Sequence, residues 1–251
     1  MAGRDLAWGG CLNVRDLGGH PTADGKHTRF GAVVRADSVR QLTDEGWSEV
    51  LDYGVRTVID LRGDHERAAD PPADLPVQVV HVPFMESNED EWRETGPRID
   101  AIKARTESGA ARTSEIYLVF LEHFRKNVGA AFRAVAQAPA GGVVVHCVGG
   151  KDRTGLLTAL LLHVAGVDDE SIAADYALSE ERLRPRTTRF LEAAETDAER
   201  EEILNISRTP AEVIPALFEE LDRRYGGVVG YLRSAGVDEE DLEQARARLR
   251  G

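Results

Sequence analysis

The sequence predicts an α/β fold with a central, mostly parallel β-sheet flanked by helices. Short apolar runs rich in β-branched residues at 55–61, 77–84 and 143–146 indicate buried strands. Apolar residues recur at helical spacing over 114–137, which predicts one long amphipathic helix, and 154–164 reads as an apolar helix. A strand, a long helix and a further strand form a crossover unit, which requires parallel strands.

The N-terminal part predicts a hairpin-like entry followed by a helix. β-like runs at 12–14 and 31–34 are separated by turn residues that include Gly18-Gly19 and Asp24-Gly25. Thr43 is the expected N-cap of a short helix that Gly54 ends.

The segment 86–113 predicts an exposed loop or a mobile helical lid, because it is charged and weakly patterned. Past Gly166 the chain is expected to be helical. Asp168 caps a segment through Ser179, a capping box with proline at its first position is expected at 209–212, and Asp238 begins the last helix.

Composition predicts one domain over residues 1–251 and excludes several function classes. The net charge of −13 argues against a nucleic-acid-binding surface, which requires a clustered basic stripe. No segment approaches the roughly 20 apolar residues of a membrane span, so we expect no integral membrane segment and a cytoplasmic location. Export without a cleaved signal remains compatible with the sequence. The two cysteines cannot form a disulfide framework.

The decapeptide His146 to Gly155 carries the chemistry, because it places a cysteine and an arginine in a strand-to-helix loop. Backbone N–H groups of such a loop form a nest for an anion, and the following helix adds its positive end. Arg153 supplies a planar fork suited to bidentate phosphate binding. The same field favours a Cys147 thiolate, since thiols at helix N-termini titrate at roughly 3.5–7.5. We therefore expect Cys147 to be a nucleophile beneath a bound phosphate.

The other loop residues are expected to bind the substrate. Glycines let the backbone approach the ligand closely, and the Thr154 hydroxyl is expected near the sulfur. A structural thiol on a tight turn is the alternative for an isolated Cys-x5-Arg pattern, but the whole decapeptide favours catalysis. The predicted substrate-binding residues are Val148, Gly149, Gly150, Lys151, Arg153 and Thr154.

The motif His-Cys-x-x-Gly-Lys-Asp-Arg-Thr-Gly resembles the phosphate loop of the bacterial protein tyrosine phosphatase B-type family. Further landmarks of that family resemble segments 13–16, 35–38, 60–66, 174–176 and 231–236, so the resemblance covers most of the chain. It implies a phosphatase fold, no metal or other cofactor, and a phosphotyrosine protein or a phosphoinositide as substrate. By matching position it implies that Cys147 is the nucleophile and Arg153 binds phosphate.

The general acid is the point at which the sequence departs from that family. The family's acid is an aspartate two residues after a Pro-Phe pair, whereas Glu86 stands at that position here. Glu86 is the first candidate, and Asp90 replaces it if the loop folds differently. Asp152 matches a residue linked to recognition and catalysis, but Arg153 and the helix terminus are expected to keep it ionised.

The remaining polar candidates are expected to be structural. His146 is interpreted as a residue that orients the loop through a backbone hydrogen bond. The arginines 15, 35 and 62 are expected to pair with Asp16, Asp37 or Glu66 and to brace the loop. His123 and His163 show no metal-ligand spacing, and Cys11 is expected to be an ordinary thiol.

Three other functions compete with a cysteine-dependent phosphatase. A nucleotide-binding loop fails because Asp152 follows Lys151 where serine or threonine is needed, and because Val145 replaces the first glycine. A sulfurtransferase fits the Arg-Thr-Gly ending less well. A catalytically inactive phosphate-binding scaffold is the alternative from another class, although intact Cys147 and Arg153 count against it.

Overall fold

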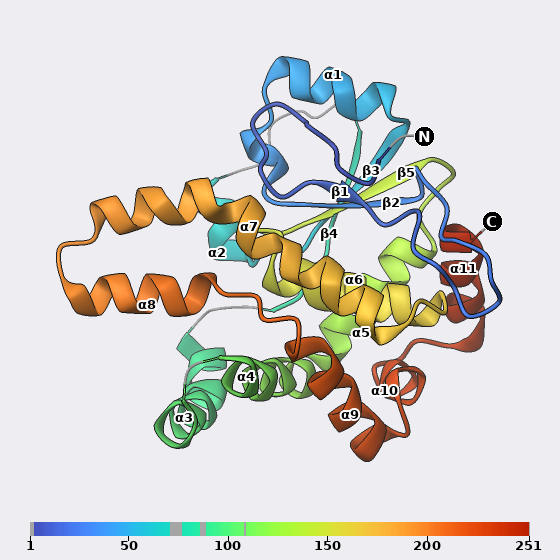
Figure 1. Cartoon of the computed structure of the whole chain (residues 1–251). Helices are drawn as coiled ribbons and strands as arrows, with labels where there is room; N and C mark the ends of the chain where they lie inside the picture. The colour runs from blue at the N-terminus through green and yellow to red at the C-terminus, as the bar shows by residue number, and fades with distance from the viewer. Residues whose placement is uncertain (1–2, 71–76, 86–88, 108, 251) are drawn as a thin grey trace.

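In the computed structural model, residues 3–70, 77–85, 89–107 and 109–250 are described. A mixed sheet lies at the centre, with strands in the order β1-β2-β5-β3-β4 (Figure 1). Among the strands of the described residues only the β1–β2 pair is antiparallel, so the predicted α/β fold with a mostly parallel sheet is confirmed. The strands are β1 (Arg15–Asp16), β2 (Val33–Ala36), β3 (Val55–Asp60), β4 (Gln78–His81) and β5 (Gly142–His146).

The central strands are buried on both faces, which explains why they are continuous apolar runs. Val34, Val58 and Val144 pack with Val50 of α1 on one face. Val143 and Val145 join the larger core on the other face, where α5 and α6 lie (Figure 1). The helices are α1 (Asp44–Asp52), α2 (Asp64–Ala69), α3 (Glu89–Arg105), α4 (Ala110–His123), α5 (Arg125–Ala136), α6 (Asp152–Val164), α7 (Asp169–Ala193), α8 (Asp197–Ser207), α9 (Val213–Tyr225), α10 (Val228–Ser234) and α11 (Glu239–Arg250), with a 3₁₀ turn at Val39–Gln41.

The predicted N-terminal hairpin forms with a shifted first strand. Strand β1 begins at Arg15, not at Leu12, because the backbone N–H groups of Leu12 and Asn13 donate to the Asp37 carboxylate and not to a strand. The Thr43 hydroxyl accepts a hydrogen bond from the Gly46 N–H, which confirms the N-cap of α1.

The single helix predicted over 114–137 is wrong, since Phe124 separates α4 from α5. The apolar periodicity continues through the break, but the two halves are buried against different partners. Helix α4 packs against α3 and α9, whereas α5 packs against α11 and the sheet. Gly129 fixes the path of α5, because a Cβ there would lie 2.1 Å from the Ala235 carbonyl oxygen.

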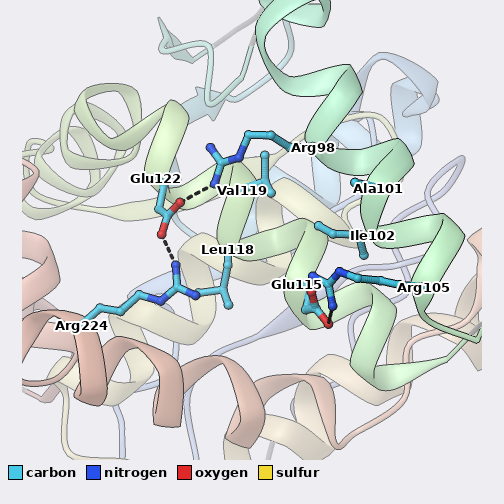
Figure 2. A pocket seen from close by; sticks show the side chains of 9 residues that line it. All are labelled: Arg98, Ala101, Ile102, Arg105, Glu115, Leu118, Val119, Glu122 and Arg224. Carbon is cyan, nitrogen blue, oxygen red and sulfur yellow. Dashed lines mark hydrogen bonds and ion pairs between the residues drawn. The ribbon is translucent and has the colours of Figure 1, made fainter.

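Residues 89–105 form the helix α3, so the helical alternative for this segment is confirmed there, while its action as a lid stays a prediction. Ile99 and Ile102 pack against Val119 of α4. Glu122 of α4 pairs with both Arg98 of α3 and Arg224 of α9 (Figure 2). These contacts join three helices beside the sheet.

The C-terminal half is helical as expected, with different boundaries. Helix α7 runs past Ser179 and across Pro185 to Ala193. It lies antiparallel to α8, a pairing that the sequence pattern does not predict (Figure 1). The capping box predicted at Thr209 is wrong, because α9 begins at Val213. Thr209 instead donates its hydroxyl to the Ala177 carbonyl of α7, which anchors the α8–α9 connection.

Asp238 precedes the last helix as predicted, and its carboxylate accepts a hydrogen bond from the Asp241 N–H. Across the described ranges, no helix combines the length and apolar character that a membrane crossing demands.

Candidate active site

The predicted phosphate loop lies between the end of β5 and the start of α6, and it forms the floor of a pocket. Cys147 is only 2% exposed and faces this pocket. Helix α6 starts at Asp152, two residues earlier than predicted, so Arg153 lies in its first turn. The loop residues that line the pocket are Cys147, Val148, Gly149, Lys151, Asp152 and Arg153.

Gly150 and Thr154 do not line the pocket, although both were predicted to bind substrate. Gly150 has a φ of 62°, and a Cβ there would lie 2.3 Å from the Ala36 carbonyl oxygen of β2. Only glycine fits this contact. Thr154 is buried within α6, and its hydroxyl has no hydrogen-bond partner among the described residues.

Buried polar side chains hydrogen-bond to the backbone of the loop from behind. Arg35 donates to the Gly150 carbonyl at 2.7 Å. The Asn13 amide donates to the carbonyls of Gly149 and Gly150 at 3.0 and 3.1 Å. Arg15 in turn donates to the Asn13 amide oxygen at 2.6 Å. These bonds fix the carbonyls of Gly149 and Gly150 on the side of Asn13 and Arg35. A loop held in this way suits the binding of an anion by backbone N–H groups.

The bracing role predicted for Arg15 and Arg35 is therefore observed, but the partners predicted for them are wrong. Both arginines pair with Asp175 of α7, at 2.9 and 2.7 Å, and not with Asp16 or Asp37. Burial alone raises the pKa of Asp175, but Arg15 and Arg35 outweigh it and hold that pKa well below its ordinary value.

Arg153 is held by Glu66 of α2, which also lines the pocket. One guanidinium nitrogen donates to Glu66 Oε1 at 2.8 Å and the other donates to Oε2. Burial lowers the pKa of Arg153, but Glu66 and Cys147 outweigh it and raise that pKa above its ordinary value. Arg62 was predicted to pair with Glu66 and pairs instead with Asp60 and Asp70.

Asp152 is half-exposed in the pocket and is the centre of a small hydrogen-bond network. Its Oδ1 accepts from the Lys151 ammonium at 2.7 Å and from the Tyr117 hydroxyl at 2.5 Å. Burial raises the pKa of Asp152. Lys151 and Tyr117 outweigh that effect and hold the pKa below its ordinary value, as the sequence predicted in direction.

The other candidate acids lie outside this pocket or outside the described residues. Glu86 falls in the segment 86–88, which the structure does not describe, so its assignment stays a prediction. Asp90 is exposed at the start of α3, pairs with Arg93 at 2.8 Å and does not line the pocket.

His146 orients the loop as predicted. Its Nδ1 lies 3.1 Å from the Cys147 carbonyl oxygen, and burial lowers the pKa of His146 to about 4, so the ring is neutral at pH 7. Cys11 donates its thiol hydrogen to the Ser38 carbonyl, and burial followed by the charge of Asp37 raises its pKa strongly. A raised thiol pKa makes Cys11 a poor nucleophile.

The comparison with known proteins agrees with the loop geometry. The model of the "Tyrosine phosphatase family" matches residues 6–251 of this chain. The chain belongs to the tyrosine phosphatase family. The enzyme class and the resemblance predicted from the loop motif are therefore confirmed at the level of the family.

Two curated relatives extend this likeness to nearly the full length. The "Triple specificity protein phosphatase PtpB" of Mycobacterium tuberculosis is 28% identical over 284 residues, which cover 100% of both chains. A "Tyrosine-protein phosphatase" of Nostoc commune is 30% identical over 227 residues, which cover 87% of this chain and 74% of the relative.

The candidate active-site pocket has a second wall, which the loop motif does not predict. Leu183, Arg186 and Phe190 of α7 and Ile206 of α8 line the pocket together with the loop. Phe190 and Ile206 are 53% and 57% exposed. Their exposure follows from the packing of the α7–α8 pair, which no short motif encodes. The run of arginines at 182–189 is the feature of the sequence that could have indicated this wall.

Replacing Arg153 by lysine is expected to lower kcat/KM for an aryl phosphate by about 10²–10³-fold, comparable to the loss of a transition-state hydrogen-bond donor. An ammonium cannot reproduce the two-armed contact that Arg153 now makes with Glu66. Steady-state kinetics on purified variants measures the effect, and Arg67→Lys on α2 is the control outside the pocket. Near-normal kinetics of Arg153→Lys would refute the phosphate-binding role.

Proposed function

We propose that this protein is a cysteine-dependent phosphatase that hydrolyses phosphate monoesters through a phosphocysteine at Cys147. The observation that supports this proposal is the position of Cys147, at the floor of a pocket, in the same loop as Arg153 and at the N-terminus of α6. A dianion in that pocket meets backbone N–H groups, a helix terminus and a guanidinium together.

In the proposed reaction the Cys147 thiolate attacks phosphorus, and the bond between phosphorus and the ester oxygen breaks. The leaving oxygen takes a proton from a carboxylic acid and departs as an alcohol or phenol. Water then attacks the phosphocysteine, which releases inorganic phosphate and restores the thiolate. Arg153 neutralises the equatorial oxygens in both steps. Glu66 accepts two hydrogen bonds from its guanidinium, which has five N–H donors, so donors remain for phosphate.

Asp152 is poorly suited to deliver that proton in the free enzyme, because its lowered pKa keeps it ionised at pH 7. An ionised carboxylate beside the phosphorus suits a base that activates water in the second step, or a positioning role. We therefore retain Glu86 as the proposed acid.

A pair of variants distinguishes the two carboxylates. If Glu86 is the acid, Glu86→Gln slows the hydrolysis of alkyl and tyrosyl esters far more than that of p-nitrophenyl esters, whose leaving group needs little protonation. The same substitution flattens the basic limb of the pH profile of kcat. Asp152→Asn is expected to slow all esters alike. If Asp152→Asn instead shows the leaving-group dependence and the flattened basic limb, and Glu86→Gln shows neither, the acid is Asp152 of the loop.

The function itself is tested by hydrolysis of p-nitrophenyl phosphate in the presence of a metal chelator. Turnover is expected, since the proposed mechanism uses only side chains of this chain. Binding of phosphopeptides without turnover would favour the inactive scaffold. Formation of a persulfide with thiosulfate would favour a sulfurtransferase.

For the substrate we propose phosphotyrosine in a phosphorylated protein, with phosphoinositides as a second class. The family and the name of the Nostoc commune relative support the first, and the triple specificity in the name of PtpB supports a site that accepts more than one class. A cytoplasmic location stays a prediction. A comparison of kcat/KM across a panel of both substrate classes tests the assignment.

A further inference from the structure

The cations that line the active-site pocket differ in whether a carboxylate already pairs with them. Arg153 is paired with Glu66, and Lys151 is paired with Asp152. Arg186 of α7 has no carboxylate partner among the described residues. Its hydrogen bond to the phosphate loop is a long one, 3.4 Å from Nη1 to the Val148 carbonyl oxygen.

Arg186 lies directly against the phosphate loop. A Cβ at position 149 would be 2.5 Å from Arg186 Nη2. Gly149, unlike Gly150, has no positive φ that demands glycine, so the close approach of Arg186 is the feature that a side chain there would block. Glycine at 149 thus makes room for a guanidinium that reaches the loop from α7.

The charge of Arg186 acts on the carboxylate of Asp37, which already accepts hydrogen bonds from other groups. Asp37 is buried behind the loop, and its oxygens accept hydrogen bonds from the backbone N–H groups of Leu12 and Asn13 at 3.1 and 2.9 Å. A different arrangement holds in the pocket between α3, α4 and α9, where Glu122 pairs with both Arg98 and Arg224 (Figure 2). Arg186 is a half-buried cation that lines the active-site pocket, and it keeps N–H donors that no described residue accepts.

From this arrangement we propose that Arg186 binds a second phosphate carried by the substrate next to the phosphate that Cys147 attacks. This inference rests on the proposed phosphatase function. It assigns the role to Arg186 in preference to Lys151, because the Lys151 charge is already compensated by Asp152.

The position of Arg186 favours a compact bisphosphate over an acidic phosphopeptide. Its guanidinium lies over residues 148 and 149, immediately after Cys147. A tyrosyl ring holds the flanking carboxylates of a peptide a full ring length away from the loop. Two phosphates on adjacent carbons of a polyol are close enough for one to lie on Cys147 and the other to meet the planar fork of Arg186.

The test compares Arg186→Gln with the wild type on two soluble probes, an inositol monophosphate and an inositol bisphosphate with phosphates on adjacent ring carbons. The ratio of kcat/KM for the bisphosphate to that for the monophosphate is expected to fall about tenfold or more, the loss typical of a charge-assisted bidentate contact. Arg186→Lys is expected to restore only part of the ratio. Arg189→Gln, on the exposed side of the same helix, is the matched charge control and is expected to leave the ratio unchanged.

Two further measurements separate the possible outcomes. Turnover of p-nitrophenyl phosphate reports the proposed function itself. A wild type that hydrolyses this ester but neither inositol probe overturns the second-phosphate site, whereas a wild type that hydrolyses none of the three contradicts the proposed function on which the site rests. An Arg186→Gln ratio equal to that of the wild type overturns the second-phosphate site, as does a fall matched by Arg189→Gln. The same headgroup on a short-chain soluble lipid shows whether the bisphosphate is recognised free or as part of a lipid; an Arg186-dependent preference in either form supports the site.

Discussion

Cys147→Ser is expected to lower kcat for an aryl phosphate on the order of 10⁴-fold or more, because a serine hydroxyl with no adjacent general base is not a competent nucleophile. Binding of the phosphate ester is expected to persist. The groups that hold the dianion, which are the loop N–H groups, Arg153 and the start of α6, are untouched by the substitution.

Stopped turnover combined with retained binding distinguishes this result from a general loss of structure. Calorimetric titration of Cys147→Ser with a phosphotyrosine peptide measures the binding, and Cys11→Ser is the matched control. Cys11 donates to the Ser38 carbonyl and lies outside the pocket, so Cys11→Ser is expected to keep normal turnover. Substantial turnover by Cys147→Ser would remove the phosphocysteine mechanism.

The central sheet and the loop could be predicted because their signals are local. Strand β5 is an uninterrupted apolar run, and the residues that follow it carry their chemistry in ten consecutive positions. The break at Phe124 could not be predicted from apolar spacing. It depends on the different neighbours of α4 and α5, which only the assembled fold determines.

The same distinction applies to the charged residues. Arg15 and Arg35 were expected to pair with acids nearby in sequence, whereas both pair with Asp175, more than a hundred residues away. Arg186 went unnoticed because α7 was expected to end at Ser179. A residue's type indicates that it needs a partner, but the partner follows from the topology.

Asp175→Asn is expected to lower the free energy of unfolding by about 3–5 kcal/mol, the usual cost of removing one partner from a buried ion pair. Asp175 is 1% exposed and compensates Arg15 and Arg35, which are also buried, together with the half-buried Arg4. An amide of the same shape keeps some hydrogen bonds but leaves the two buried guanidinium charges without compensation. A loss of this size is a large part of the 5–15 kcal/mol that stabilises a typical domain.

The pH dependence gives this prediction a second readout. Because Asp175 has a folded-state pKa well below its unfolded value, its contribution is fully present above the unfolded pKa of about 4 and is lost as pH falls toward the folded pKa. The stability difference between the wild type and Asp175→Asn is therefore expected to be constant near pH 7 and to shrink below about pH 4. Thermal unfolding monitored by circular dichroism measures it, with a decrease of about 10 °C in the midpoint expected at neutral pH.

Asp90→Asn is the matched control, since Asp90 also pairs with an arginine but is exposed on α3. Exposed pairs contribute about 0–1 kcal/mol, so this variant is expected to unfold close to the wild-type midpoint. Equal midpoints for Asp175→Asn and Asp90→Asn would show that the buried network contributes little to stability. We expect the midpoint to fall strongly for Asp175→Asn alone, together with a reduced kcat. Both effects are expected because Arg35 connects Asp175 to the Gly150 carbonyl. The Asp175 charge therefore stabilises the fold and also holds the phosphate loop in its binding conformation.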